Sequence, residues 1–395
     1  MKKICFLKII LILVIILLLP AGCHIVNAAD TNDSQMDESY NQNKEELQGL
    51  YDYINKMGSD SELISKINPE SFVKTFILNG NGNLSFDTIL NILIKVTFKE
   101  LSGVLYFAIS IIVIGIICAL LKNLQDSFSS KSIADISFYG CYAILIILIS
   151  NSFLIAVNIC KDTINGLSNF MAAILPVLVT MIAASGGVTQ SMTLDPVIMW
   201  TVVLIPRVYL TVIIPLVLTN FVLQFANNLS NEHKITNLCK MLKQFTLWIQ
   251  GIIITSFIAI LTVRGITSST LDAVALKTTK FAVDNFIPIV GKSFSDAITS
   301  VAGYSLIIKN AVSSMGLIVI VLYILYPIIK IVMISLIYKF SAAIVEPICD
   351  KRITDLISSS AESLTVILSC VLSISLMFFI FIAILASSGK FVLGA

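Results

Sequence analysis

Residues 101–121 read LSGVLYFAISIIVIGIICALL and contain no charged side chain. An apolar run of roughly 18 residues or more is long enough to cross the hydrocarbon core of a bilayer as a helix. Across the 395 residues, 57% are hydrophobic and only 13% are charged, whereas about a quarter of a typical soluble domain is charged. The sequence therefore predicts an all-α polytopic membrane helical bundle and excludes an ordinary soluble or disordered protein. Three further uncharged stretches are predicted spans: Tyr139–Ile159, Phe245–Val263 and Leu364–Leu385.

Four other apolar segments have more than one interpretation. Two are interrupted by proline, and each is either one kinked span or two short ones: Val197–Ala226, with Pro206 and Pro215, and Ala311–Ile348, with Pro327. Two are less apolar and rich in small residues, and each either crosses the membrane or re-enters it: Leu167–Ala184 and Phe281–Ile308. We therefore expect broken or re-entrant segments within the bundle.

The first 28 residues have the three parts of a signal peptide: a basic start, the apolar core Ile9–Leu19 and small residues after it. Val26-Asn27-Ala28 fits ordinary cleavage, Ala21-Gly22-Cys23 resembles a lipoprotein cleavage box, and an uncleaved anchor is the third alternative. In all three, residues 29–97 form an acidic extracytoplasmic segment, in which Asn68-Pro69 predicts a helix start. This small helical segment is either a cap on the membrane domain or a docking surface for an outside partner.

The second part of the membrane region resembles the first, which predicts an internal duplication. Four matches occur in the same order at offsets of roughly 110 to 125 residues: Phe170–Val177 with Phe281–Ile289, Leu204–Arg207 with Leu325–Pro327, Lys234–Leu238 with Arg352–Leu356, and Phe257–Leu261 with Phe381–Leu385. We divide the membrane region into two first spans (98–160), repeat 1 (161–266) and repeat 2 (267–395). Basic residues near 234–243 and 351–352 place both loops in the cytoplasm, so the repeats are expected to run parallel.

Transporters built from repeats often bind their substrates at broken helices in corresponding positions. Here those positions are Pro176 to Gly187 and Pro288 to Gly303. A charge within an apolar stretch is a further sign of function, although a long side chain can also snorkel to an interface. The alternative for the small residues is close helix packing. The predicted polar lining of a pathway is Pro176, Ser185, Gly186, Gly187, Arg207, Pro288, Gly291, Ser295, Asp296, Gly303, Lys309 and Lys330; Asp296 and Lys309 are expected to pair with each other or with Arg207, or to form a purely structural pair.

Catalytic chemistry has little support in the sequence. The chain has two histidines, and it has neither closely spaced cysteine pairs nor a phosphate-binding loop. We predict that it is not an enzyme, that it needs no cofactor or metal, and that it binds no nucleic acid.

Several membrane motifs together resemble the stage III sporulation protein AE family of endospore-forming Firmicutes: Leu175-Pro176-Val177-Leu178, Ala183-Ala184-Ser185-Gly186-Gly187, the run from Lys280-Phe281 through Phe286-Ile287-Pro288-Ile289-Val290-Gly291 to Ser295-Asp296-Ala297, and Gly303-Tyr304-Ser305-Leu306 with Lys309-Asn310-Ala311-Val312. The resemblance implies a multi-pass protein of the mother-cell (outer forespore) membrane, with its N-terminal segment in the intermembrane space. It also implies partners: the other proteins of the stage III sporulation AA–AH complex and, through them, a forespore channel partner. The lipid bilayer is the remaining partner.

The resemblance implies a membrane component of a channel or secretion-like complex that links mother cell and forespore and is required for late forespore development. Two alternatives belong to other classes of protein. One is an independent secondary transporter (permease) of a small solute, and the other is a non-conducting membrane scaffold.

Overall fold

The computed structural model describes residues 44–60, 63–65, 68–79, 86–127, 131–188, 191–192, 196, 200–229, 235–286 and 291–388. Within these ranges the chain is helical and has no strand, as the sequence predicts. The predicted signal peptide and Pro288 lie outside the described residues. The elements are α3 (Lys44–Asp60), α4 (Pro69–Asn79), α5 (Phe86–Ser127), α6 (Lys131–Ala184), η1 (Trp200–Leu204), α8 (Ile205–Val208), η2 (Tyr209–Ile213), α9 (Ile214–Leu229), α10 (Thr236–Phe286), α11 (Gly291–Val345) and α12 (Lys351–Ser387).

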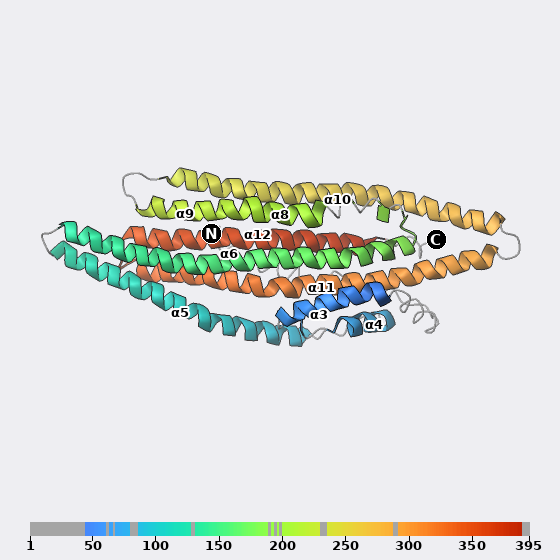
Figure 1. Cartoon of the computed structure of the whole chain (residues 1–395), viewed down its shortest axis with the longest axis horizontal. Helices are drawn as coiled ribbons and strands as arrows, with labels where there is room; N and C mark the ends of the chain where they lie inside the picture. The colour runs from blue at the N-terminus through green and yellow to red at the C-terminus, as the bar shows by residue number, and fades with distance from the viewer. Residues whose placement is uncertain are drawn as a thin grey trace.

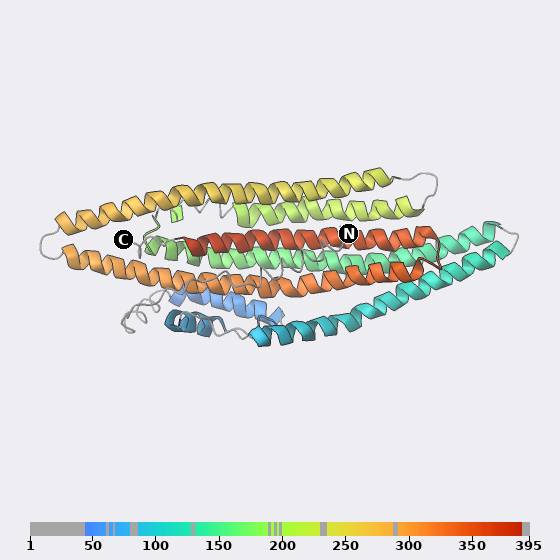
Figure 2. The ribbon, with the colours of Figure 1, turned by 180° about the vertical axis from the view of Figure 1, so that it is seen from behind.

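The long helices lie side by side along one axis and form an elongated bundle (Figure 1). The pair α9 and α10 forms one edge, α6, α11 and α12 form the middle, and α5 lies at the other edge with α3 and α4, an order that the view from behind repeats (Figure 2). Helices α10 and α12 run in one direction, and α9 and α11 run in the opposite one. Each pair is a hairpin of antiparallel helices, and the hairpin α9–α10 has the same orientation as the hairpin α11–α12. Parallel repeats are expected to have this arrangement.

Six segments of the described chain are long and apolar enough to cross a membrane. Three helices are much longer than one crossing requires: α6 has 54 residues, α10 has 51 and α11 has 55. At 1.5 Å per residue they extend roughly 75–85 Å, against about 30 Å for the hydrocarbon core. Part of the bundle therefore projects beyond a single bilayer.

Two of the ambiguous segments are uninterrupted helix. Helix α6 continues without a break from Lys131 through Leu167–Ala184. Helix α11 likewise passes through Pro327. Proline removes one backbone hydrogen bond from a helix, and α6 accommodates Pro176 at an exposed position.

The irregular backbone of the predicted first repeat begins after α6. Gly186 has a φ of 94°, a left-handed backbone conformation that ends the helix. The amide of Gly187 then donates to the carbonyl of Ile182 at 2.9 Å and closes the last turn. Farther along, the π-helical turns η1 and η2 flank Pro206. Such turns insert extra residues into a helix and often occur near functional positions.

Helices α3 and α4 pack against the bundle. Leu47, Leu50 and Ile54 are fully buried within the common hydrophobic core, and the Tyr53 hydroxyl donates to the carbonyl of Gly166 in α6 at 3.5 Å. Helix α4 begins where Asn68-Pro69 predicts, with the Asn68 side chain accepting from the Ser71 amide at 3.1 Å. These two helices pack along the side of the bundle, α3 against α6 and α4 against α11. The cap and the docking surface stay predictions.

Candidate functional site

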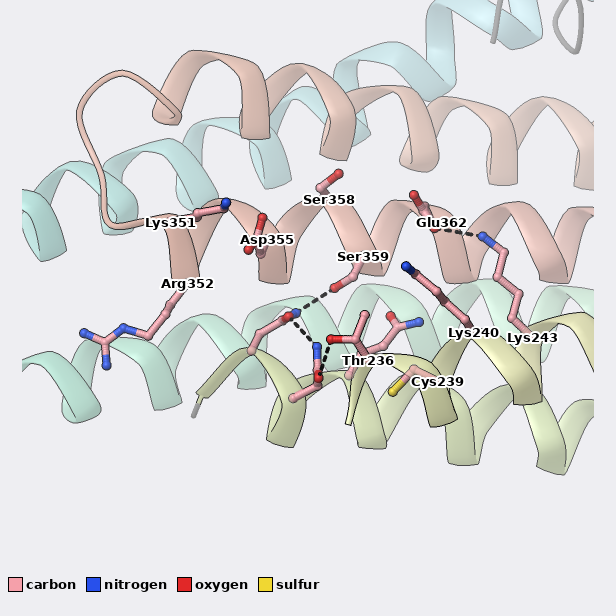
Figure 3. Close-up of a pocket in the computed structure, with 13 residues that line it drawn as sticks. Thr236, Cys239, Lys240, Lys243, Lys351, Arg352, Asp355, Ser358, Ser359 and Glu362 are labelled. Atoms are coloured by element: carbon pink, nitrogen blue, oxygen red, sulfur yellow. Dashed lines mark hydrogen bonds and ion pairs between the residues drawn. The ribbon is translucent and has the colours of Figure 1, made fainter. Parts of the chain in front are cut away.

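The end of the bundle where α10 and α12 begin contains a polar pocket of about 310 Å³. Its walls come from the last turns of α9 and the first turns of α10 and α12 (Figure 3). The lining residues are Gln224, Asn227, Asn228, Thr236, Cys239, Lys240, Lys243, Lys351, Arg352, Asp355, Ser358, Ser359 and Glu362. We call this the basic pocket, because its lining carries four cationic and two anionic side chains.

Two of the four cations are already paired. Lys243 Nζ lies 2.8 Å from Glu362 Oε2, joining α10 to α12. Arg352 lies 3.3 Å from Asp350 and stacks over the ring of Phe138 at 3.9 Å, and Asp350 also caps α12 by accepting from the Arg352 amide at 2.9 Å. The Lys243–Glu362 pair thus joins α10 to α12, whereas the Arg352 contacts lie within the start of α12 and against Phe138 of α6.

The other two cations have no carboxylate partner among the described residues. Lys240 extends from α10 toward α12, and Lys351 stands at the first turn of α12 (Figure 3). Both side chains are exposed at the rim. The one unpaired carboxylate of the described lining is Asp355, so the pocket keeps an excess of positive charge.

A chain of neutral hydrogen bonds crosses one wall of the pocket. The Thr236 hydroxyl donates to Asn227 Oδ1 at 3.0 Å, and Asn227 Nδ2 donates to Asn228 Oδ1 at 3.3 Å. Asn228 Nδ2 then donates to the Ser359 hydroxyl at 2.9 Å. The last contact links α9 to α12, and the row of polar side chains continues from there into the bundle.

Deeper polar side chains extend this row between α9, α10 and α12. The Ser363 hydroxyl donates to Gln224 Oε1 at 3.0 Å, and the Ser369 hydroxyl donates to Gln250 Oε1 at 3.0 Å. Gln250 Oε1 also accepts from Ser373 at 3.4 Å. We call the row the polar seam: Asn220, Gln224, Asn228, Gln250, Ser359, Ser363, Ser369 and Ser373.

Helical spacing explains why these residues share a face. Asn220, Gln224 and Asn228 recur every four residues on α9, so they point in one direction. Asn220 is 3% exposed, and its Oδ1 atom accepts no hydrogen bond from any residue that the structure describes. An unsatisfied buried oxygen costs roughly 1–3 kcal/mol, so its retention in an apolar helix calls for an explanation.

The same chain matches a known family along most of its length. Residues 67–389 fit the family model described as Stage III sporulation protein AE. The chain belongs to the stage III sporulation protein AE family. It is 27% identical over 313 residues to Stage III sporulation protein AE of Bacillus subtilis (strain 168), an alignment covering 79% of this chain and 78% of that protein. No solved structure matches it.

As a stage III sporulation AE family member, the chain is a sporulation membrane protein, which agrees with the resemblance described above. Its predicted pathway residues do not form one cluster in the described structure. Ser185, Gly186 and Gly187 terminate α6, and Ser185 and Gly187 are buried there. Gly291, Ser295 and Asp296 belong to the first turns of α11, where side chains lie outside the described part. Pathway roles for these residues remain predictions.

The predicted charged residues occupy three different environments. Arg207 is exposed, next to the π-helical turns. Lys309 is fully buried, and its ammonium group donates to the carbonyls of Ala386, at 3.0 Å, and Ser388, at the C-terminal end of α12. Lys330 forms an ion pair with Glu100 of α5 at 3.1 Å and lies 3.0 Å from the Tyr326 hydroxyl. Lys309 and Lys330 thus each connect two helices.

Sequence reasoning did not single out the polar seam. Its signal was present as single amides at intervals of four in the apolar run of α9, and as serines at intervals of four and six in α12. The prolines and glycines indicated a site more strongly, because transporter sites commonly lie at broken helices. Only the packing of α9 and α10 against α12 brings the amides and serines together.

Proposed function

We propose that this protein is a membrane component of the channel or secretion-like complex that links mother cell and forespore, and that it is required for late forespore development. It would reside in the mother-cell (outer forespore) membrane, with its N-terminal segment facing the intermembrane space. Its partners would be the other proteins of the stage III sporulation AA–AH complex and, through them, the forespore channel partner. It would act without catalysis or a cofactor of its own.

The polar seam is the observation that supports a pathway. Hydrogen-bonded amides and serines run from the basic pocket into an otherwise apolar bundle, between the first-repeat helices α9 and α10 and the second-repeat helix α12. Polar groups at membrane depth are costly and commonly mark the route of a solute or ion. In this proposal the bundle is closed as described, and separation of α12 from α9 and α10 opens the route.

A scaffold is the second candidate, and the hydrogen bonds that most seam side chains make to one another favour it. Ser363 bonds both Gln224 and the carbonyl of Ser359, and such contacts also hold membrane helices together. In that case the seam would fix the helices and never admit water. The two candidates differ in whether seam side chains meet water during sporulation.

Thiol accessibility in sporulating cells separates the two. The eight native cysteines would be replaced, and single cysteines introduced as Ser363→Cys and Ser369→Cys. The matched control is Ser335→Cys, because Ser335 is a buried serine that contacts α12 through the Ala361 carbonyl, outside the seam. A small charged methanethiosulfonate reagent should modify the seam positions and leave position 335 unmodified. Protection of both seam positions, with an exposed residue of α3 labelled normally, would contradict the pathway and support the scaffold.

A further inference from the structure

We propose that the basic pocket binds the phosphate group of an anionic phospholipid, held chiefly by Lys240 and Lys351. The pocket has room for a headgroup, at about 310 Å³. This inference does not depend on the pathway proposed above, because a lipid site would serve a channel and a scaffold alike.

Charge is the first argument. Lys243 and Arg352 are neutralised by Glu362 and Asp350, which leaves Lys240 and Lys351 facing the single carboxylate of Asp355 within the described lining. Helices α10 and α12 both begin at the pocket, and the N-terminal end of a helix dipole favours an anion. An anion is therefore the ligand that completes the charge balance.

The donors around the two lysines suit a phosphate. Ser358 adds a hydroxyl to the pocket lining, whereas the hydroxyls of Ser359 and Thr236 already donate to the Leu356 carbonyl and to Asn227 Oδ1. Phosphate oxygens accept several hydrogen bonds at once, and lysine binds phosphate as a mobile point charge. Figure 3 shows Lys240 of α10 extending toward α12 and Lys351 at the first turn of α12, with Asp355 between them along that helix.

The surroundings favour a lipid over a soluble phosphate compound. The basic pocket lies at the start of α10, and the next turns of that helix expose apolar side chains: Met241, Phe245, Leu247 and Trp248. Leu247 is two turns from Lys240 on the same face of α10. Basic pockets between membrane helices on the cytoplasmic side are known positions for anionic lipid headgroups, and an adjoining apolar surface accommodates acyl chains.

Native mass spectrometry of the purified full chain would test the proposal. The protein in detergent would be titrated with palmitoyl-oleoyl phosphatidylglycerol and, separately, with phosphatidylcholine of the same chains. We expect tighter binding of the first phosphatidylglycerol molecule, and a loss of about fivefold in that affinity for each of Lys240→Gln and Lys351→Gln. Lys339→Gln is the matched control, because Lys339 is an exposed lysine of α11 outside the pocket.

Three outcomes would overturn the proposal. Equal affinity for the two lipids would remove the preference for an anion. A preference that survives the double substitution Lys240→Gln with Lys351→Gln would place the lipid elsewhere. Displacement of phosphatidylglycerol by inorganic phosphate or glycerol phosphate alone would assign the pocket to a soluble phosphate. The variant Lys240→Arg with Lys351→Arg keeps both charges and should retain binding, which separates loss of charge from loss of folding.

Discussion

The rings of Phe257 in α10 and Phe381 in α12 pack edge to face, with centroids 6.0 Å apart and planes at 88°. Both are buried, and they occupy matching places in the repeated sequence Phe-Ile-Ala-Ile-Leu. Since α10 and α12 run in the same direction, this contact joins corresponding points of the two proposed repeats. A duplicated unit that associates with its own copy would produce such a contact between equivalent residues.

Removal of one ring should weaken the junction between the repeats. Phe381→Ala is expected to lower the free energy of unfolding by about 3–5 kcal/mol, and Phe381→Leu by less than about 1.5 kcal/mol, because leucine leaves a smaller cavity. A double-mutant cycle with Phe257→Leu should yield a coupling of about 0.5–1.5 kcal/mol. The measurement is unfolding of the purified protein by dodecyl sulfate in mixed micelles. Strict additivity of the two substitutions would show that the rings do not interact.

Gly316 is a point where α11 closely approaches both α6 and α12. A methyl group added there would overlap Ile174 Cδ1 of α6 and lie 3.3 Å from Ile382 of α12. Gly316→Ala should be mild, since the Ile174 side chain end can turn away, whereas Gly316→Leu should prevent accumulation of folded protein. Gly303→Leu is the control on the same helix, because no described atom of a neighbour lies within 4 Å of the place that its first side-chain carbon would occupy. Immunoblots of membranes from sporulating cells would compare the variants, and equal accumulation of the two leucine variants would contradict the close approach.

Lys330 and Glu100 connect α11 to α5 through a partly buried ion pair, with 24% and 14% of the two side chains exposed. Loss of one partner leaves the other charge poorly solvated, so Lys330→Gln or Glu100→Gln should cost about 1–3 kcal/mol. The exchange Lys330→Glu with Glu100→Lys should restore part of that loss. Thermal unfolding in detergent would measure it. A swap that is as unstable as the sum of both single variants would mean that the pair contributes little to holding α5.

Local signals in the sequence predicted local structure well. Asn68 before Pro69 marks the start of α4, because an amide cap and a proline in the first turn act within one turn of helix. Apolar runs likewise predicted the helices that are long and apolar enough to cross a membrane, because the length of an apolar run can be read directly from the sequence. The continuity of α6 was harder to predict, because one exposed proline is compatible with both a kinked and an intact helix. The polar seam was the feature hardest to predict, because it depends on which face of α12 contacts Gln224 and Gln250. Packing between helices distant in the sequence decides that face.

Asn220 and Gln250 provide a test that separates stability from function. Gln250 bonds Ser369 and Ser373, so Gln250→Leu should lower the free energy of unfolding by about 1–2 kcal/mol. Asn220 Oδ1 has no donor among the described residues, so Asn220→Leu should leave stability unchanged or raise it by about 1 kcal/mol.

If the polar seam is a pathway, both substitutions should reduce the yield of heat-resistant spores, because each replaces a polar lining group by an apolar one. Spore counts would be compared with protein accumulation and with dodecyl sulfate unfolding of the same variants. Reduced sporulation by a stable, normally accumulating Asn220→Leu protein would support the pathway, since a scaffold has no use for an unsatisfied oxygen. Normal sporulation with Asn220→Leu, together with a defect in Gln250→Leu that follows its lower stability, would show instead that the seam serves to hold α9, α10 and α12 together.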